Sequence, residues 1–311
     1  MTRRRRTIRM LAAALAALFL AGALSACGDD EPSGGGGDGA SLPAITVGSA
    51  NFPENVLLAE IYAGALEAKG ATVSKKLNVG SREALFPAMQ QGDIHLLPEY
   101  TGALLSFVSK GTAEARDTAS QVTALTAQLP AELAVLEPST AEDKDTVTCN
   151  KETVDKYSLV SIEDVAKVDD QIVMGGPPEL RSREGFGLPG LKKVYGIEFK
   201  EFKALDVAGP LTVAALKDNK VNCANLFSTQ SAIAVNGFIS LDDPKGVVEG
   251  ENVIPLVAKD KATPEVTDTL NAVSAALDTE TLKGLVKRVE VDKEAPADVA
   301  ASFLTDKGLG S

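Results

Sequence analysis

The chain has 311 residues, 44% of them hydrophobic and 24% charged, which is the composition of a globular protein large enough for two lobes. Its 43 acidic residues outnumber 31 basic ones, and this balance excludes nucleic acid as a partner, since phosphates bind clustered Lys and Arg. The single histidine, His95, excludes a histidine-rich metal site and any Ser-His or Cys-His catalytic scheme that does not use it, so no metal ion or cofactor is expected.

Residues 1–26 have the layout of a signal peptide. An arginine-rich start precedes an apolar stretch at 10–20, which is shorter than the roughly 20 residues that a membrane-spanning helix needs. The sequence LSAC at 24–27 resembles the lipobox of bacterial lipoproteins, in which cleavage before the cysteine exposes a residue that carries lipid chains. The alternatives are a secretory signal with an incidental cysteine and a membrane anchor. We expect Cys27 to be the lipidated first residue of the mature protein.

Residues 27–43 are polar and rich in glycine, which predicts a flexible linker between the anchor and a globular body. No later apolar run is long enough to span a membrane. The mature protein is therefore expected to be extracytoplasmic and lipid-anchored to the outer face of the cell membrane.

From residue 44 onward, short runs of β type alternate with helical periods. The strands predicted from this alternation are 44–47, 71–79, 93–97, 145–149, 171–174, 198–203 and 221–227. The helices predicted from apolar periodicity and capping residues are 54–70, 81–91, 118–133, 151–167, 189–195, 210–219 and 228–236. Strands separated by helices predict mainly parallel sheets that are covered on both sides. The last segment, 263–309, is nearly all helical and is expected to pack over one lobe.

Two cysteines remain if Cys27 carries lipid. Cys149 and Cys223 both lie in apolar, alternating runs that predict strands. An even pair in an oxidising compartment favours a disulfide, whereas the alternative is two buried free thiols. The separation of their Cα atoms, which decides between these alternatives, does not follow from the sequence. We predict the disulfide.

The remaining motifs point to no catalytic centre. Residues 185–190, GFGLPG, match the G-x-G-x-x-G pattern of dinucleotide sites, but the strand that should precede them is missing, because residues 179–184 read ELRSRE. We interpret these glycines as turn formers ahead of a helix. His95 alternates with apolar neighbours and is interpreted as a strand histidine rather than a general base. The zinc-protease, nucleophile-elbow and P-loop motifs do not occur.

Two junctions between a strand and a helix are candidates for ligand binding. Residues 47–54 end a strand and begin a helix with Ser49 or Asn51 as the cap, and residues 79–83 do the same with Ser81. Both junctions place free backbone N–H groups at the edge of a sheet, where polar or anionic ligand groups bind. The simpler interpretation is ordinary helix capping.

Both junctions belong to strings that resemble one protein family. The strings are GSANFPENVLLAEIYAGALEAKG, KKLNVGSREALFPAMQQGDIHLLPEYTG, GGPPELRSREGFGLPGLKKVYG and EFKALDVAGPLTVAALKDNKVNCANLFST. In this order they resemble the osmoprotectant (glycine betaine/choline/proline betaine) substrate-binding lipoproteins of ABC transporters, over nearly all of residues 44–311. The resemblance implies an α/β, two-lobed periplasmic-binding-protein-like fold (type II) with the ligand cleft between the lobes. It assigns 44–144 plus 249–311 to lobe 1 and 145–248 to lobe 2.

The resemblance also implies a function. The chain is expected to be the extracytoplasmic substrate-binding protein of an ABC importer for quaternary ammonium or osmoprotectant-type solutes, and not an enzyme. Its partners would be a small-molecule solute, an ABC permease and the ATPase of that permease, with the binding protein itself a monomer. The alternatives are a different small ligand, polyhydroxylated or aromatic, in the same role, an envelope scaffold lipoprotein, and an acidic extracellular hydrolase.

Members of this family hold a quaternary ammonium head in a cage of aromatic faces and pair its carboxylate with cationic or hydroxyl groups. Tyr100 in PEYTG matches a cage tyrosine, and Phe227 in NLFST lies where another aromatic residue is common. Arg183 is the best match for the carboxylate-binding arginine. Asp145 and Glu251 stand where relatives carry the remaining cage tyrosines. The full predicted ligand-binding set is Ser49, Asn51, Phe52, Ser81, Tyr100, Thr101, Asp145, Arg183, Phe227, Ser228 and Glu251.

The chain departs from the family pattern at several of these positions. Ala50 stands in GSANF where many relatives have a polar residue, and Ala103 replaces a threonine in YTGA. With four tyrosines and no tryptophan, the chain has little material for a full aromatic cage. Losing aromatic faces weakens the attraction for a cation, and added carboxylates oppose a carboxylate on the ligand. We therefore expect weak binding or none for glycine betaine, and a preference for a cation without a carboxylate, such as choline, or for a ligand that offers hydroxyl donors.

Overall fold

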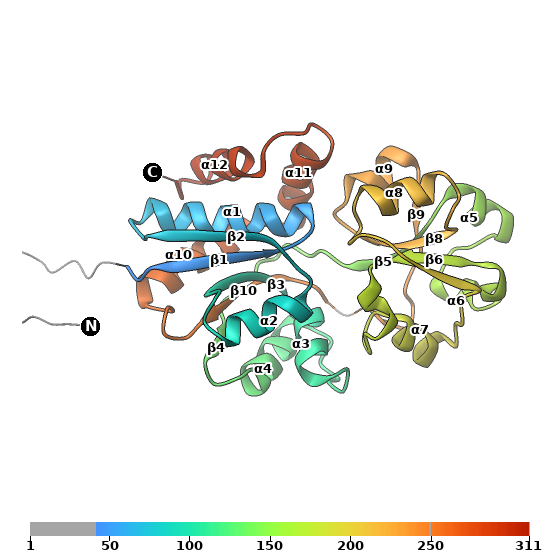
Figure 1. Cartoon of the computed structure of the whole chain (residues 1–311), viewed down its shortest axis with the longest axis horizontal. Coiled ribbons are helices and arrows are strands. Elements are labelled where there is room, and N and C mark those ends of the chain that lie inside the picture. The colour runs from blue at the N-terminus through green and yellow to red at the C-terminus, as the bar shows by residue number, and fades with distance from the viewer. Residues whose placement is uncertain (1–41, 249, 311) are drawn as a thin grey trace, which may run out of the picture. The chain divides into compact units, whose positions relative to one another are not determined.

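The computed structural model describes residues 42–248 and 250–310, so the signal peptide, Cys27 and nearly all of the linker lie outside the described residues. The described part contains two five-stranded sheets, each covered by helices on both faces (Figure 1). This mixed α/β architecture is the one that the alternation of strands and helices predicts. Among the described residues, no helix combines the length and the apolar character that crossing a membrane requires.

The first sheet has the strand order β2-β1-β3-β10-β4. Its strands are β1(Ile45–Ala50), β2(Val73–Gly80), β3(Leu96–Tyr100), β4(Leu133–Val135) and β10(Val253–Ala258). One face packs against α1(Pro53–Ala68), α10(Pro264–Ala276), α11(Thr279–Glu290) and α12(Pro296–Asp306), and the other against α2(Arg82–Gln90), α3(Thr101–Ser109) and α4(Thr118–Gln128) (Figure 1). The C-terminal helices therefore do pack over the first sheet, as predicted, and most of α1 is buried between them and the strands.

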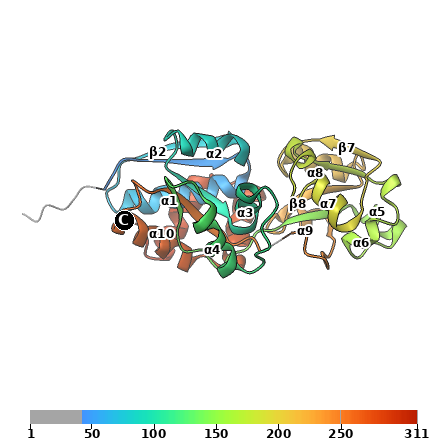
Figure 2. The same cartoon turned by 90° about the horizontal axis from the view of Figure 1, so that it is seen from below.

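The second sheet has the order β7-β6-β8-β5-β9. Its strands are β5(Asp145–Cys149), β6(Val173–Gly176), β7(Glu201–Ala204), β8(Cys223–Phe227) and β9(Ile239–Ser240). One face is covered by α5(Lys151–Tyr157), α6(Ile162–Val165) and α7(Leu188–Tyr195), and the other by α8(Pro210–Lys217) and α9(Ser231–Asn236); Figure 2 shows these elements from a second direction. Short 3-10 helices occupy Asp169–Gln171 and Pro178–Arg181.

Each sheet contains one reversed strand. In the first sheet β10 runs antiparallel to both of its neighbours, β3 and β4, while β1 is parallel to β2 and β3. In the second sheet β5 is the reversed strand, antiparallel to β8 and β9. These are the strands that the chain forms on first entering the second sheet and on returning to the first. The sheets are thus mainly parallel, as predicted, apart from the two strands next to the crossings.

Several predicted elements or boundaries were wrong. The helix predicted over 118–133 ends at Gln128, because Pro130 follows two residues later and the chain turns into β4. The helix predicted over 151–167 is two helices, since Ser158 adopts a left-handed backbone with φ of 53° and Ser161 starts a new capping box with Asp164. The sequence analysis also missed α3, β4, β9 and β10. The strand predicted over 93–97 is β3, which begins at Leu96, so His95 precedes the strand rather than lying in it.

Cys149 and Cys223 are directly opposite each other in the antiparallel pairing of β5 and β8 and form a disulfide. Their Cα atoms are 3.9 Å apart, and both residues are fully buried. The bond therefore joins two central strands of the second sheet at the end that lies farthest from Asp145 along β5.

The glycine motif is a structural turn. The segment before α7 is a 3-10 helix and a loop rather than a strand, and a Cβ atom at Gly190 would lie 1.6 Å from the carbonyl oxygen of Gly185. The glycines therefore allow the loop to pack directly on the helix. His95 lies just before β3, where its Nδ1 accepts a hydrogen bond of 2.9 Å from the backbone N–H of Thr46. The described residues contain no group of three or more His, Cys, Asp or Glu that could hold a metal ion.

Candidate ligand-binding site

A cavity of about 60 Å³ lies where the carboxyl ends of β1 and β3 meet the start of β5 and the end of β8. It adjoins a larger groove of about 590 Å³, and five residues line both spaces. The shared residues are Arg82, Ala103, Asp145, Arg183 and Glu251. The carboxyl ends of strands in α/β sheets are the usual place for ligands, so we take the cavity as the candidate site.

Eight of the predicted ligand-binding residues line this cavity. They are Asn51, Phe52, Ser81, Tyr100, Asp145, Arg183, Phe227 and Glu251. They come from the parts of the chain that form both sheets and are separated by up to two hundred positions in the sequence. The fold therefore brings into one cavity residues that were predicted separately, each from its own motif.

The other three predicted residues do not line the cavity, and their side chains form hydrogen bonds within the fold. Ser49 is fully buried, and its Oγ accepts a bond of 2.9 Å from the backbone N–H of Asn78. Thr101 donates to the carbonyl oxygen of Gly250 at 3.0 Å. Ser228 accepts from the backbone N–H of Lys144 at 2.9 Å, which ties the segment after β8 to the one before β5. All three support the walls of the site from behind.

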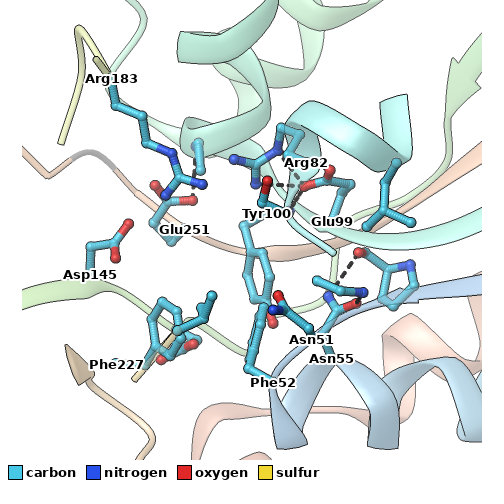
Figure 3. A pocket seen from close by; sticks show the side chains of 17 residues that line it. Asn51, Phe52, Asn55, Arg82, Glu99, Tyr100, Asp145, Arg183, Phe227 and Glu251 are labelled. Atoms are coloured by element: carbon cyan, nitrogen blue, oxygen red, sulfur yellow. Dashed lines mark hydrogen bonds and ion pairs between the residues drawn. The ribbon is translucent and has the colours of Figure 1, made fainter. Parts of the chain in front are cut away.

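Aromatic rings form one side of the cavity (Figure 3). The ring of Phe52 lies 4.8 Å from that of Phe227 and 6.3 Å from that of Tyr100, measured between centroids. Phe52 immediately precedes α1, Tyr100 ends β3 and Phe227 ends β8, so the two sheets both contribute. Contact with the face of one such ring stabilises a desolvated cation by roughly 0.5 to 2 kcal/mol.

Asn55 fixes the relative position of two strand ends beside these rings. Its Oδ1 accepts a bond of 2.7 Å from the N–H of Ala50 at the end of β1, and its Nδ2 donates to the carbonyl oxygen of Pro98 in β3 at 3.0 Å. The residue is buried in the first turn of α1. The sequence analysis did not predict Asn55, although this residue directly follows the 47–54 junction.

A buried ion pair occupies the wall beside the aromatic rings. The Nε of Arg82 donates to both carboxylate oxygens of Glu99, at 2.9 and 3.0 Å, and Nη2 donates to Oε2 at 2.7 Å. This fork-shaped contact is the strong geometry for an arginine and a carboxylate. Burial disfavours the charged guanidinium, but the adjacent Glu99 outweighs that effect and raises the pKa of Arg82. Sequence reasoning missed both residues, even though Arg82 directly follows the predicted Ser81.

The opposite wall carries looser charges. Arg183 makes one contact, from Nε to Oε1 of Glu83 at 3.2 Å, and its side chain is 26% exposed. Asp145 accepts a bond of 2.7 Å from Nδ2 of Asn225, and Glu251 accepts one of 3.0 Å from the N–H of Ala103. Figure 3 shows Arg183, Asp145 and Glu251 on the same side of the cavity.

Burial raises the pKa of both carboxyls on this wall. Desolvation is the largest cause for each; Arg183 partly offsets it at Asp145, and the N–H of Ala103 partly offsets it at Glu251. Among the described residues, no ion pair within 4.0 Å reaches either carboxylate. A positively charged ligand would supply the missing partner and favour the ionised forms.

A second buried cluster lies directly behind the aromatic rings. The hydroxyl of Tyr100 donates to Oε1 of Glu54 at 2.7 Å, and the hydroxyl of Thr229 contacts Oε2 of Glu54 and lies 2.9 Å from Oδ1 of Asp143. Burial raises the pKa of Glu54 to about 6, and it raises the pKa of Asp143 well above its ordinary value. Asp143 also lines the cavity, which sequence reasoning did not predict.

Two five-stranded α/β sheets, each with one reversed strand next to a crossing, and a polar and aromatic cavity lined from both, define a solute-binding protein of the two-lobed periplasmic class. Comparison with known proteins gives the family. Residues 43–306 match the model of the substrate-binding domain of the ABC-type glycine betaine transport system, and the chain belongs to this family. It is accordingly the substrate-binding component of an ABC transporter.

Named relatives are consistent with that membership. The chain is 28% identical over 279 residues to the glycine betaine-binding protein YehZ of Escherichia coli (strain K12), covering 85% of this chain and 90% of that protein. It is 26% identical to a glycine-betaine-binding protein of Pseudomonas aeruginosa (strain PAO1) over 98% of this chain and 96% of that protein. A solved structure described as a glycine betaine/carnitine/choline ABC transporter shares the fold, with a TM-score of 0.66, 21% identity, and coverage of 85% and 99%.

Proposed function

We propose that this protein binds a small quaternary ammonium cation that lacks a carboxylate, with choline as the representative, and delivers it to an ABC permease. The observation that carries the proposal is the pairing state of the charges in the cavity. Arg82 is already paired with Glu99 and Arg183 with Glu83, while among the described residues no cationic side chain forms an ion pair within 4.0 Å with Asp145 or Glu251.

The aromatic side of the cavity supports the quaternary ammonium part of this proposal. Phe52, Tyr100 and Phe227 present adjacent rings. A methylated ammonium group is weakly hydrated, so it can pack against these rings at a small desolvation cost. The hydroxyl of Tyr100 points away toward Glu54, which leaves the ring rather than the hydroxyl for the ligand. A hydroxyl on the ligand would donate to the carboxylate of Asp145 or Glu251.

A zwitterion such as glycine betaine fits this cavity less well. Its carboxylate would have to share Arg183 with Glu83 or displace Glu99 from Arg82, and in either position it would approach the carboxyl groups of Asp145 and Glu251. Like charges in a partly desolvated site repel strongly. The names of the relatives point toward glycine betaine, so the two ligands give a direct test.

Calorimetry with choline, carnitine and glycine betaine on the mature protein tests the proposal. We expect choline to bind at least about tenfold more tightly than glycine betaine, a difference of roughly 1.4 kcal/mol. The double variant Asp145→Asn, Glu251→Gln should narrow that ratio, whereas Glu198→Gln, an acid outside the cavity, should leave it unchanged. Tight binding of glycine betaine with weak binding of choline would refute the choice of ligand. If no quaternary ammonium compound binds, the same measurement with small polyhydroxylated and aromatic compounds tests the alternative ligands.

The cellular setting completes the proposal. We infer that Cys27 carries lipid and holds the protein at the outer face of the cell membrane, where a monomer presents the solute to the permease and its ATPase without catalysing a reaction. The LSAC string and the polar linker support this part. The variant Cys27→Ala should lose membrane association or fail to mature. Membrane retention of a correctly cleaved Cys27→Ala protein would contradict the anchor.

A further inference from the structure

The cluster behind the aromatic rings contains one hydroxyl between two carboxyl groups. Oγ1 of Thr229 lies within hydrogen-bond distance of Oε2 of Glu54 and, at 2.9 Å, of Oδ1 of Asp143. A hydroxyl carries a single proton, so it can donate to only one of these oxygens. The other contact is favourable only if that carboxyl is itself protonated and donates to the threonine oxygen.

The remaining hydrogen bonds show that the two carboxyls belong to one network. Oδ1 of Asp143 also accepts the N–H of Thr229 at 3.1 Å and faces the hydroxyl of Ser228 at 3.3 Å. Glu54 accepts the hydroxyl of Tyr100 at 2.7 Å, and its side chain also hydrogen-bonds with that of Asp143, which lowers the pKa of Glu54 and raises the pKa of Asp143. The consistent arrangement is one protonated and one ionised carboxyl, with the hydroxyl of Thr229 between them. All three of these side chains are almost fully buried.

The segments that meet at this cluster also carry the rings of the cavity. Phe52 lies two residues before Glu54, and Phe227 lies two residues before Thr229, while Tyr100 bonds to Glu54 directly. Forming the cluster therefore sets the positions of all three rings at once, and it links the start of α1 in the first sheet to the end of β8 in the second.

We propose that Glu54 and Asp143 hold one proton between them across Thr229, and that this proton-bearing bridge positions the aromatic wall for the ligand. Glu54 and Asp143 are positioning residues, since they act through Tyr100, Phe52 and Phe227. The proposal rests on the proposed function only for the ligand part of its test.

The pH dependence follows from the direction of the shifts. Both carboxyls have a raised pKa because they are buried, so the assembled bridge keeps a proton that separated carboxyls would release near about pH 4. Stability from the bridge is thus fully present below about pH 4 and is lost as the pH rises through about 6 and above. The titratable groups facing the pair from neighbouring elements are Tyr100 on β3 and Glu290 on α11; the latter adds a small further upward effect on Glu54.

Infrared spectroscopy of the ligand-free protein tests for the proton directly. The wild type at pH 5 should show carbonyl absorption from buried protonated carboxylic acids, and Glu54→Gln should reduce it, because the amide donates to Thr229 without a titrating proton. Asp143→Asn is the second variant, in case the first does not fold. Asp145→Asn is the control, since it removes another buried acid outside the bridge. Absorption that is undiminished in both bridge variants would overturn the proposal.

Unfolding and binding measurements test the positioning role. Between pH 5 and 8.5 the thermal midpoint of the ligand-free wild type should fall with rising pH more steeply than that of Glu54→Gln. Choline affinity of the wild type relative to Glu54→Gln should fall by up to about tenfold per pH unit above the pKa of the pair, while the two proteins bind similarly at pH 5. Parallel pH profiles would overturn the role. If choline does not bind at any pH, the proposed ligand fails, and the infrared and unfolding results still decide the bridge.

Discussion

The two arginines of the candidate site differ in almost every physical respect. Arg82, beside the ends of the first-sheet strands, is buried and held by Glu99 through three short contacts. Arg183, which precedes α7 over the second sheet, is partly exposed and has one contact of 3.2 Å with Glu83. A charge that is buried and fully paired shapes a site, whereas one that is loosely paired can respond to a ligand. We therefore predict that the pair of Arg82 and Glu99 stabilises the cavity, whereas the loosely paired Arg183 responds to the solute.

The largest effect should come from breaking the first of these pairs. Arg82→Met leaves the buried carboxylate of Glu99 without its partner, and removing one member of a buried pair costs about 3 to 5 kcal/mol. The matched control is Arg183→Met, which removes a partly exposed pair that contributes at most about 1 kcal/mol. Urea unfolding of both variants measures the difference. Equal destabilisation by the two substitutions would remove the distinction between the two sides.

The next largest effect concerns the second sheet. Replacing both Cys149 and Cys223 with alanine should lower the free energy of unfolding by about 2 to 4 kcal/mol, because the closed loop between them constrains the unfolded chain. The effect should appear in denaturant unfolding and should leave the selectivity between choline and glycine betaine unchanged. Alkylation of the unreduced, denatured wild type should label neither cysteine. Two labelled thiols in the exported protein would contradict the bond in the cell.

Removal of a ring should be a smaller but more specific change. Tyr100→Ala should weaken choline binding by roughly tenfold, since a single aromatic face contributes 0.5 to 2 kcal/mol to a desolvated cation. Tyr100→Phe keeps the ring and loses only the bond to Glu54, so its affinity at pH 5 should stay closer to that of the wild type. Calorimetry distinguishes the two. Undiminished binding by the alanine variant would place the ligand elsewhere.

The smallest effect should be that of a single selecting charge. Burial raises the pKa of Asp145, and a bound cation favours its ionised form. The contribution of Asp145 to choline affinity should therefore increase as the pH rises through that pKa. Asp145→Asn should flatten this increase and reduce choline affinity at pH 8 by up to about fivefold. The sign is opposite to that of the Glu54 and Asp143 pair. Comparison of Asp145→Asn with Glu54→Gln over pH therefore separates the two contributions.

Much of the fold followed from local pattern. The alternation around Val147 predicted β5 with its observed bounds, and the helix predicted over 189–195 matches α7 to within one residue. Strand direction did not follow, because the reversal of β5 and β10 depends on where the chain crosses between the sheets. Helix α3 was missed because Thr101 continues directly from β3 without a turn residue.

Some residues of the candidate site could likewise be predicted from the sequence, and others could not. Phe52, Tyr100 and Phe227 were predicted from motifs that resemble a family, and the structure brings them together. Glu99 and Thr229 were not predicted, because a buried polar residue is recognised by the partner it meets, and that partner lies far away in the sequence. Ser49 shows the converse, since a hydroxyl at a promising junction was already satisfied by a neighbouring strand.

The two crossings between the sheets have a consequence for engineering. The N–H of Asp143 bonds to the carbonyl oxygen of Glu251 at 3.0 Å, so the chain leaves the first sheet and re-enters it at one place. In topological terms the second sheet with its helices is a cassette inserted into a loop of the first, and insertions of this kind are tolerated where both ends lie close together. Exchange of this cassette between relatives, cut at these two positions, would transfer Asp145, Arg183 and Phe227 as a unit while leaving the buried Arg82 and Glu99 pair untouched.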